Sequence, residues 1–292
     1  MEKLKHKEKI IRSKRENICH EVVFVLLILY TITLLFPFFF LLMNSFKVNP
    51  NEMMEHPMQF PRDFGFSSYV TAITEMNERG TTILGMFYNT VTLAVGQTIV
   101  SMSLTCMAAY TLAKYRFKFN GVIYMIILIC SVVPTFGSEP SMYKLMAIDL
   151  NLRNTYLGMM LMCGGFGAAF LYLHSFFKEI PWSFAESAML DGASDVRIFL
   201  QIMLPLAKNG IMVFTIMKFI GFWNDYWIPF LYYYDHPTLS VGLTLLSKNP
   251  DLKQQKSIFY AGTILCIIPA LVFYALLQDK LMGNLNAGGI KG

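Results

Sequence analysis

The sequence predicts an all-α membrane protein with six transmembrane helices and with both termini in the cytoplasm. Three observations lead to this prediction. Of the 292 residues, 55% are hydrophobic and 15% are charged, a composition that ordinary soluble domains do not have. Six windows approach the roughly 20 apolar residues that a helix needs to cross a bilayer. Basic residues are concentrated in connections on one side of the predicted membrane, which is the cytoplasmic side.

The predicted spans are apolar runs with few charges. They cover residues 22–43, 87–112, 121–138, 154–177, 209–234 and 257–278. The fifth is the least regular, because it contains Lys218 and Asp225. The strands of a membrane barrel would instead give segments of about ten residues with alternating hydrophobicity, and the sequence shows none. These runs therefore predict a helical bundle.

The amino-terminal segment resembles a signal peptide in one respect, because a basic arm precedes an apolar run. However, the run is longer than the about 7–15 apolar residues of a signal peptide, and residues 44–47 offer no small-residue cleavage site. We therefore expect a retained first helix. The expected organisation is a basic cytoplasmic arm (1–21), a first helix with its exterior loop (22–83), a five-helix core (84–282) with a cytoplasmic loop (178–208), and a cytoplasmic tail (283–292).

Basic residues set the predicted orientation. The amino-terminal arm carries Lys3, Lys5, Lys7, Lys9, Arg12, Lys14 and Arg15, and the connection after the second window carries Lys114, Arg116 and Lys118. The loop 44–83 has three basic residues beside five acidic ones, which is typical of an exterior loop. Three lysines between the fifth and sixth windows argue weakly for the opposite orientation. The balance places both termini in the cytoplasm.

Proline and small residues predict local departures from regular helix. The prolines of loop 44–83 favour an irregular cap with a short helix near residues 67–78. Pro134 and Pro269 fall inside predicted spans, where proline kinks or opens a helix. In the fourth span small residues recur four positions apart, in the pairs Gly164–Ala168 and Gly165–Ala169. This spacing favours close helix packing, with the lining of a pathway as the alternative.

The connection between the fourth and fifth spans predicts two short helices set at an angle. Pro181 suits the first turn of the first helix. Asp191-Gly192 then forms a stop, because glycine can adopt positive φ. The Ser194 hydroxyl can cap the second helix, which has Asp195 at its positive end. The predicted product is a compact knob that projects into the cytoplasm.

This connection carries a specific pattern. Its residues Glu186-Ser187-Ala188, Asp191-Gly192-Ala193 and Leu204-Pro205 resemble the EAA loop of ATP-binding-cassette (ABC) importer permeases, with Ser187 where that family usually has alanine. The resemblance extends over nearly the whole chain, through elements such as Asn44-Ser45-Phe46-Lys47 and Trp223-Asn224-Asp225. The terminal Gly288-Gly289-Ile290-Lys291-Gly292 is similar to the G-G-x-K-G ending of the shorter, second permease of maltose-type importers.

The resemblance implies a type I ABC importer permease fold in the bacterial plasma membrane. It implies a transmembrane subunit through which a sugar or oligosaccharide, delivered by an extracytoplasmic binding protein, is taken up by alternating access. The implied partners are a second permease in a heterodimer, an ATPase dimer in the cytoplasm and the sugar-binding protein, with no nucleic acid. We expect no catalysis by this chain and no cofactor on it, with ATP and Mg on the partner ATPase. In agreement, the sequence has no G-x-x-x-x-G-K-[ST] phosphate loop.

The resemblance also assigns roles within the knob. The expected ATPase-coupling residues are Glu186, Ser187, Ala188, Asp191, Gly192 and Ala193. Glu186 is expected to meet a basic residue of the ATPase. Gly192 is expected to let the turn pack closely.

The outer end of the fifth span is a candidate solute path. Its candidate residues are Trp223, Asn224, Asp225 and Tyr226, which lie in a stretch crowded with aromatic residues. Sugar rings stack on aromatic side chains, and sugar hydroxyls hydrogen-bond to Asn and Asp. An interfacial aromatic belt gives the same composition without a substrate, so both interpretations stay open. The loop 235–256 is expected to face the binding protein.

Two ionised side chains, Lys218 and Asp225, lie well inside a predicted span. A charge at the centre of a bilayer costs on the order of 2.5–3.5 kcal/mol, so both are expected to face protein or water. Two interpretations remain open. In the first, Lys218 snorkels or pairs with a neighbouring helix and Asp225 lies near the outer interface. In the second, they contact the solute directly.

Two other functions remain as alternatives. A secondary transporter driven by an ion gradient would show repeated halves and several buried acids or histidines, and Asp225 alone is thin support. A membrane enzyme would need a nucleophile with a base, or paired acids, and His174 has no evident partner in the sequence. A secondary transporter would also leave the knob unexplained.

Overall fold

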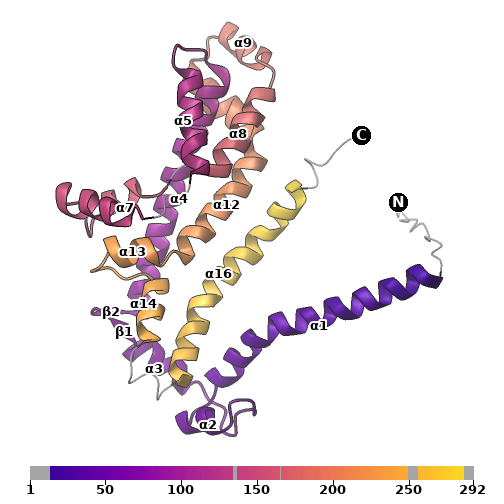
Figure 1. The fold of residues 1–292 in the computed structure, drawn as a ribbon, viewed down its shortest axis with the longest axis vertical. Coiled ribbons are helices and arrows are strands. Elements are labelled where there is room, and N and C mark those ends of the chain that lie inside the picture. Colours follow the sequence, from indigo (N-terminus) through magenta and orange to yellow (C-terminus); the bar gives the residue numbers. More distant parts are fainter. Residues whose placement is uncertain (1–13, 134–136, 165, 249–255, 286–292) are drawn as a thin grey trace.

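The computed structural model describes residues 14–133, 137–164, 166–248 and 256–285 of the chain. A bundle of helices forms its centre (Figure 1). The packed helices of this bundle are α4 (Ile83–Lys114), α5 (Asn120–Val132), α8 (Gly167–Glu179) and α12 (Lys208–Asn224). Two further long helices, α16 (Lys256–Leu285) and α1 (Lys14–Ser45), differ in their packing. The first lies against α12, whereas α1 contacts α16 and then projects away from the bundle (Figure 1).

Shorter elements lie at the two ends of the bundle and beside it (Figure 1). At one end are α9 (Ser183–Leu190), α10 (Asp195–Ile198), the π-helical turn η2 (Phe199–Met203) and α11 (Leu204–Leu206). Toward the other end are α2 (Pro50–Glu55), α3 (Ser67–Glu75), the antiparallel hairpin of β1 (Asn77–Glu78) with β2 (Thr81–Thr82), and α14 (Leu239–Leu246). The remaining elements are α6 (Glu139–Tyr143), the π-helical turn η1 (Lys144–Asp149), α7 (Tyr156–Leu161) and α13 (Trp227–Tyr232).

Helices occur in all six predicted spans, but the described residues contain fewer than six uninterrupted ones. Three segments are long and apolar enough to cross a membrane alone: Ile18–Ser45, Ile83–Lys114 and Lys256–Ala275. The pair Asp195–Leu206 and Lys208–Asn224 meets the same test together, with a bend of 82° between its parts. The third span contains the 13-residue helix α5, and its Pro134 lies outside the described residues. Pro269 lies inside α16.

The predicted continuous helix across the fourth span is wrong, because the chain breaks between α7 and α8. Gly164 and Gly167 have φ values of +86° and +51°, which a right-handed helix cannot contain. The predicted small-residue packing motif is therefore not helical at Gly164, and Gly165 lies outside the described residues. A methyl group added at Gly164 or Gly167 would meet no non-neighbouring atom within 4 Å. Among the described residues, these glycines serve a turn of the chain and not a close contact between two helices.

The fifth span is also broken, so its predicted continuity is wrong as well. Asp225 has extended backbone angles and ends α12. Its carboxylate accepts hydrogen bonds from the backbone amides of Trp227 at 3.0 Å and Ile228 at 3.3 Å. Short acidic side chains compete in this way for backbone donors and thereby cap a new helix. Asp225 consequently separates α12 from α13 and does not stand inside one long helix.

The loop after α1 folds back on the end of that helix. The predicted short helix near residues 67–78 is confirmed by α3. Asn44 donates to the Pro57 carbonyl at 3.1 Å, and the Ser45 hydroxyl lies 2.6 Å from the Tyr69 hydroxyl. Lys47 is fully buried, and its ammonium donates to the His56 carbonyl at 2.7 Å. The element Asn44-Ser45-Phe46-Lys47, which resembles the importer family, therefore joins the end of α1 to the loop by hydrogen bonds. We call this group of contacts the latch.

Two ionisable side chains, Lys47 and Glu52, are buried in this latch. Burial lowers the pKa of the Lys47 ammonium, and the nearby Glu52 carboxylate opposes that shift. Glu52 is itself buried and accepts a hydrogen bond from the Arg62 amide at 2.8 Å. The hydrogen bonds of Lys47 and Glu52 therefore hold the first part of this loop in a defined structure.

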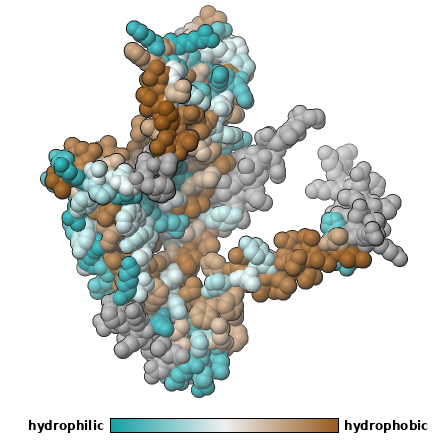
Figure 2. Space-filling model, viewed as in Figure 1, coloured by the Kyte–Doolittle hydropathy of each residue, from teal (hydrophilic) through white to brown (hydrophobic). Residues whose placement is uncertain are grey.

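Helix α1 exposes apolar side chains along its described length. Figure 2 shows it as a hydrophobic arm that leaves the body of the molecule. Side chains from Val22 to Leu35 point to solvent on every face, with exposed fractions such as 64% for Phe24 and 62% for Tyr30. Near its carboxyl end, Phe40 meets Tyr260 of α16 with ring centroids 6.1 Å apart. A helix that is apolar all round is stable in lipid or against other helices, not in water.

Candidate functional site

The knob predicted between the fourth and fifth spans is present and lies at one end of the bundle (Figure 1). Its first helix, α9, begins at Ser183, slightly later than the expected start at Pro181. The turn after α9 is closed by two backbone bonds, from Gly192 to the Met189 carbonyl at 3.0 Å and from Ala193 to the Ala188 carbonyl at 2.9 Å. Gly192 has φ +80°. This is the Schellman arrangement that ends helices at glycine.

The second helix of the knob was predicted to begin after Ser194, and α10 begins there. The Ser194 hydroxyl accepts a hydrogen bond from the Arg197 amide at 3.4 Å and so caps α10. The helical path continues through η2 and α11 beyond Pro205 and then bends into α12 at Ala207. Because the bend joins the two helices directly, displacement of the knob must also displace the start of α12.

The knob is anchored to the end of α4 by contacts that the sequence did not reveal. The Tyr115 hydroxyl donates to the Asp195 carboxylate at 3.0 Å. Lys114 donates to the Ile180 carbonyl, and the rings of Tyr110 and Phe199 lie 4.9 Å apart. Burial and the hydrogen bonds with Tyr110 and Asp195 raise the pKa of the Tyr115 hydroxyl, so it stays a donor at neutral pH.

A buried apolar cluster completes this anchoring. It joins α4, α8 and the knob through fully buried side chains: Ala109, Phe170, Phe177, Ala185, Ile198 and Met203. Close packing of this kind resists deformation, because protein interiors are nearly as dense as organic crystals. The knob is therefore rigidly coupled to the bundle.

The six predicted coupling residues all lie in the knob, but they divide into two groups. Glu186, Ser187, Asp191 and Gly192 are exposed, whereas Ala188 and Ala193 are half-buried and pack against the buried cluster. The Glu186 amide donates to the Trp182 carbonyl at 3.1 Å, but its carboxylate has no hydrogen bond or ion pair among the described residues. Within the same residues, a methyl group at Gly192 would touch nothing within 4 Å. Inside this chain, Gly192 is needed for its backbone angle and not for close packing.

The surface of the knob also carries apolar side chains. The exposed ones are Phe184, Met189, Leu190 and Val196, and Leu190 has the largest exposed fraction, 89%. Exposed apolar residues on one part of a surface are typical of a protein interface. The sequence alone did not predict that these apolar residues are exposed, because the same residues also suit a buried helix face.

The four predicted solute-path residues do not form one site. Trp223 is buried and packs against Phe87, Phe219 and Phe273, with centroid distances of 6.1, 5.7 and 6.1 Å. With Asn224 it lines a cavity of about 310 Å³ between α12, α14 and α16. The cavity is mostly apolar, and the Asn224 amide donates to the Ile220 carbonyl.

Asp225 and Tyr226 have other surroundings. The Asp225 side chain caps α13, and its backbone carbonyl accepts a hydrogen bond from the Ser240 hydroxyl at 2.6 Å. Tyr226 stacks on Phe230 with ring centroids 5.2 Å apart. These contacts account for both residues without a solute.

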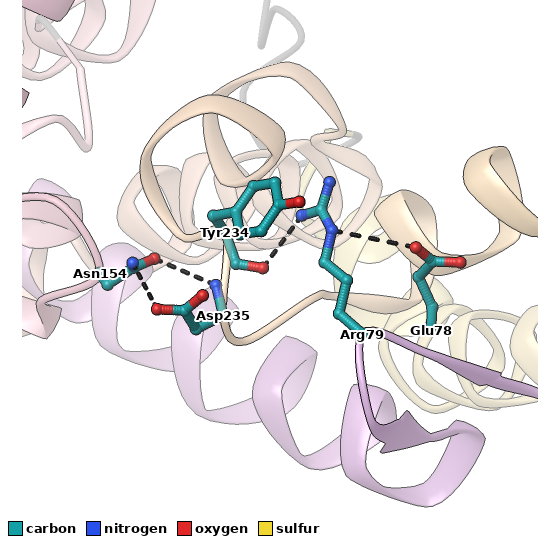
Figure 3. Close-up of polar contacts among 5 residues, drawn as sticks. All are labelled: Glu78, Arg79, Asn154, Tyr234 and Asp235. Atoms are coloured by element: carbon teal, nitrogen blue, oxygen red, sulfur yellow. Dashed lines mark hydrogen bonds and ion pairs between the residues drawn. The ribbon is translucent and has the colours of Figure 1, made fainter.

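Three connections far apart in the sequence meet beside α13: the turn between β1 and β2, the segment before α7 and the segment after α13. Figure 3 shows Arg79, in the hairpin turn, donating to the Tyr234 carbonyl at 3.0 Å while its guanidinium lies 3.5 Å from the centre of the Tyr234 ring. Asn154 donates to the Asp235 carboxylate at 2.7 Å and accepts from the Asp235 amide at 3.1 Å. Arg79 and Asn154 have φ values of +52° and +58°, which side-chain contacts must compensate. This junction therefore fixes the segment that follows α13.

The described residues hold no group of three histidine, cysteine or acidic side chains that could bind a metal ion. An exposed charge, apolar contacts and rigid anchoring are suited to transmitting the movement of a partner.

Comparison with known proteins gives a consistent result. The family model described as "Binding-protein-dependent transport system inner membrane component" matches residues 101–281. The chain is 30% identical over 268 residues to the diacetylchitobiose uptake system permease protein NgcG of Streptomyces coelicolor, covering 90% of this chain and 86% of that protein. It is 28% identical over 288 residues to the maltodextrin transport system permease protein MalD of Streptococcus pneumoniae, covering 97% and 99%.

The ABC transporter permease protein YcjP of Escherichia coli is 30% identical over 277 residues, covering 91% of this chain and 94% of that protein. Among solved structures, a bacterial ABC transporter that imports the acidic polysaccharide alginate contains a chain with a TM-score of 0.78. That chain shares 22% sequence identity, and the match covers 92% of this chain and 98% of the other. At this identity the structural likeness establishes the fold alone, and it agrees with the predicted importer permease fold.

Proposed function

Because this chain belongs to the family of binding-protein-dependent transport system inner membrane components, we propose that the solute it moves is a sugar or an oligosaccharide. The chain is a permease subunit of a binding-protein-dependent ABC importer and a multi-pass protein of the bacterial plasma membrane. The observation that carries the proposal is the agreement among relatives that match nearly the whole chain. Their names specify diacetylchitobiose, starch degradation products and maltodextrin, all of them carbohydrates.

The proposed machine has several subunits. This chain pairs with a second permease, and two ATPase subunits in the cytoplasm bind ATP and Mg. An extracytoplasmic binding protein delivers the sugar. The long apolar surface of α1 supports a partner or lipid around the chain, because it has few contacts within the chain. A maltose-type subfamily remains part of the proposal; the terminal residues 288–292, on which it depends, lie outside the described residues.

The knob is the proposed coupling element. A moving ATPase surface would seat the exposed face of α9, with Glu186 opposite a basic side chain. Two routes then carry the movement into the membrane: the bond between Asp195 and Tyr115 leads to α4, and the bend at Ala207 leads to α12. Because both routes are short and packed, we propose alternating access through a rigid displacement of these helices.

We propose six crossings of type I topology with cytoplasmic termini. In this arrangement α1, α4 and α16 each cross once, α5 forms part of the third crossing, and the broken segments α7–α8 and α12–α13 cross as composite spans. The position of Lys114 supports this orientation, because this basic residue contacts the knob directly. The latch around Lys47 and the junction at Arg79 then lie outside, near the bound sugar-carrying protein.

A reconstitution experiment tests the proposed function. The complete importer, with its second permease, ATPase and binding protein, is placed in proteoliposomes, and a panel of radiolabelled neutral oligosaccharides and oligouronates is offered. We expect uptake of at least one sugar only with ATP on the ATPase side and binding protein on the other. Uptake by this chain alone under an ion gradient would show a secondary transporter instead.

A further inference from the structure

Gln97 makes a buried polar contact between two helices that are far apart in the sequence. It stands near the middle of α4 with an exposed fraction of 2%, and its side-chain amide donates to the Met159 carbonyl of α7 at 3.0 Å. Met159 is also buried. The neighbouring Gly96 shows how closely the helices approach, because a methyl group added there would meet the end of the Met160 side chain at 3.0 Å. Gln97 is therefore a specific link at a tightly packed helix contact.

The Met159 carbonyl needs a donor, because α7 ends shortly after it. In a continuing helix this carbonyl would accept a hydrogen bond from the Cys163 amide. The Cys163 amide instead donates to the Met160 carbonyl at 3.3 Å, in the tighter turn that often ends a helix. The last carbonyls of a helix lack backbone donors, and at membrane depth such groups must be satisfied within the protein. Gln97 supplies the donor, so α4 holds the end of α7.

The other end of α7 is fixed to the junction shown in Figure 3. The Asn154 amide, just before α7, donates to the Tyr232 carbonyl at 2.7 Å. The Asn154 side chain makes the two hydrogen bonds with Asp235. A buried apolar cluster that includes Leu93 of α4, Met159 and Tyr232 packs the same elements together. Helix α7 thus joins α4 directly to the segment after α13.

Helix α4 extends this connection to the knob. It continues without a break from Gln97 to Lys114, about 25 Å along its axis. At that end Lys114 contacts Ile180, and Tyr115 contacts Asp195. The contacts therefore form one connected series from the junction through α7, Gln97 and α4 to the knob. Packed side chains, hydrogen bonds and rigid helices of this kind carry energetic coupling between distant sites.

We propose that Gln97 is a positioning residue that couples the junction to the knob. Docking of the sugar-loaded binding protein outside then changes the contact with the ATPase inside. Loss of the Gln97 donor would release the end of α7 from α4 while both helices stay in place. The inference rests on the proposed function, because it assumes that the junction faces the binding protein and that the knob faces the ATPase.

ATP hydrolysis by the complete importer in proteoliposomes tests this role. The stimulation factor is the ratio of hydrolysis with the binding protein, loaded with each sugar of the same panel, to hydrolysis without it. Gln97→Met keeps the length of the side chain and removes the donor. We expect it to lower the stimulation factor at least about fivefold, with unstimulated hydrolysis and subunit composition unchanged.

Thr98→Val is the matched control for Gln97→Met. The Thr98 hydroxyl is buried in the same helix, but it donates at 2.6 Å to the Ala94 carbonyl of α4 itself. Its loss should leave the stimulation factor as in the wild type, because no link between helices is removed. An equal fall in both variants would show general damage to α4 and would overturn the inference.

A double-mutant cycle separates coupling from a merely structural role. Asn154→Gly removes the side-chain bonds with Asp235, and glycine tolerates the φ of +58° at this position. It should also lower the stimulation factor. If Gln97 and Asn154 act in one series, the double variant should lose no more than the larger single loss, whereas independent defects multiply. Multiplied losses would overturn the inference.

The remaining outcomes separate the inference from the proposed function. Wild-type stimulation in Gln97→Met would overturn the inference and leave the proposed function intact. If Gln97→Met does not assemble, Asn154→Gly decides alone, and wild-type stimulation in that variant would overturn the inference. A wild-type importer that no sugar-loaded binding protein stimulates would contradict the proposed function, and the inference with it.

Discussion

The Tyr115 hydroxyl, directly after α4, donates a 3.0 Å hydrogen bond to the carboxylate of Asp195, the first residue of α10. The two residues are 80 positions apart in the sequence. Their contact joins the end of one long transmembrane helix to the knob that we propose to meet the ATPase. A bond at such a junction has more effect on the transmission of movement than on stability.

Removing this bond should therefore uncouple the importer. We expect Tyr115→Phe to cost at most about 1 kcal/mol of stability, because the contact is exposed and water can replace the lost partner. ATP hydrolysis should persist, and the sugar moved per ATP should fall. Parallel measurement of hydrolysis and uptake in proteoliposomes checks this. Tyr30→Phe, on the exposed surface of α1, is the matched control; an equal loss of coupling there would contradict the assignment.

Substitutions of Gly192 should act through the strain that they place on the backbone, not through steric clashes. A β-branched residue is a genuine outlier at φ +80°, so Gly192→Val should destabilise the turn by about 1–2 kcal/mol. The ATPase should then dissociate from the importer in detergent. Gly192→Asn is the matched control, because asparagine tolerates this region, and it should retain the ATPase. Retention by the Val variant as well would show that the turn does not shape the interface.

Asp225 should act as a helix cap and not as a solute ligand. Asp225→Ala removes the acceptor for two amides and should cost about 1 kcal/mol, typical of a lost cap. Asp225→Asn keeps an oxygen at the same place and should restore most of the stability. Thermal unfolding of the purified complex measures both. Altered sugar preference in the Asn variant, with unchanged stability, would indicate direct solute contact instead.

Much of the fold could be predicted from the sequence, because long apolar runs and short polar connections are local features. The knob was predictable for the same reason, since the stop at Gly192 and the cap at Ser194 lie within a few residues of each other. The breaks at Gly164 and Asp225 had local signals too. Those signals were outweighed because a hydropathy window averages over single residues.

The long-range contacts could not be predicted. Asp195 was expected only to favour the positive end of its helix, and nothing near it in the sequence indicates Tyr115. The same holds for Arg79 and Tyr234, which lie 155 positions apart. Such pairs depend on how the helices pack, and a single sequence does not contain that information locally.

Arg79 offers a test of the strained junction shown in Figure 3. Arg79→Ala and Arg79→Gly both remove the guanidinium contacts with Tyr234, but only glycine relieves the positive φ. We expect the Gly variant to be more stable than the Ala variant by about 1 kcal/mol. Limited proteolysis near Tyr234 should follow the same order. Equal stability of the two variants would mean that the turn is not strained. The 3.9 Å ion pair with Glu78 is lost in both variants, so it does not affect the comparison.

The central claim is that the exposed face of α9 meets the ATPase, and chemical cross-linking tests it most directly. In membranes that contain the complete importer, a short bismaleimide should join Glu186→Cys to an ATPase subunit carrying cysteines introduced around its receiving cleft. Glu75→Cys, exposed at the end of α3 and toward the opposite end of the bundle, is the matched control and should give no such product. The account predicts cross-linking at position 186 alone. Cross-linking of the ATPase at position 75, with position 186 labelled only by impermeant reagents from outside the cell, would contradict it.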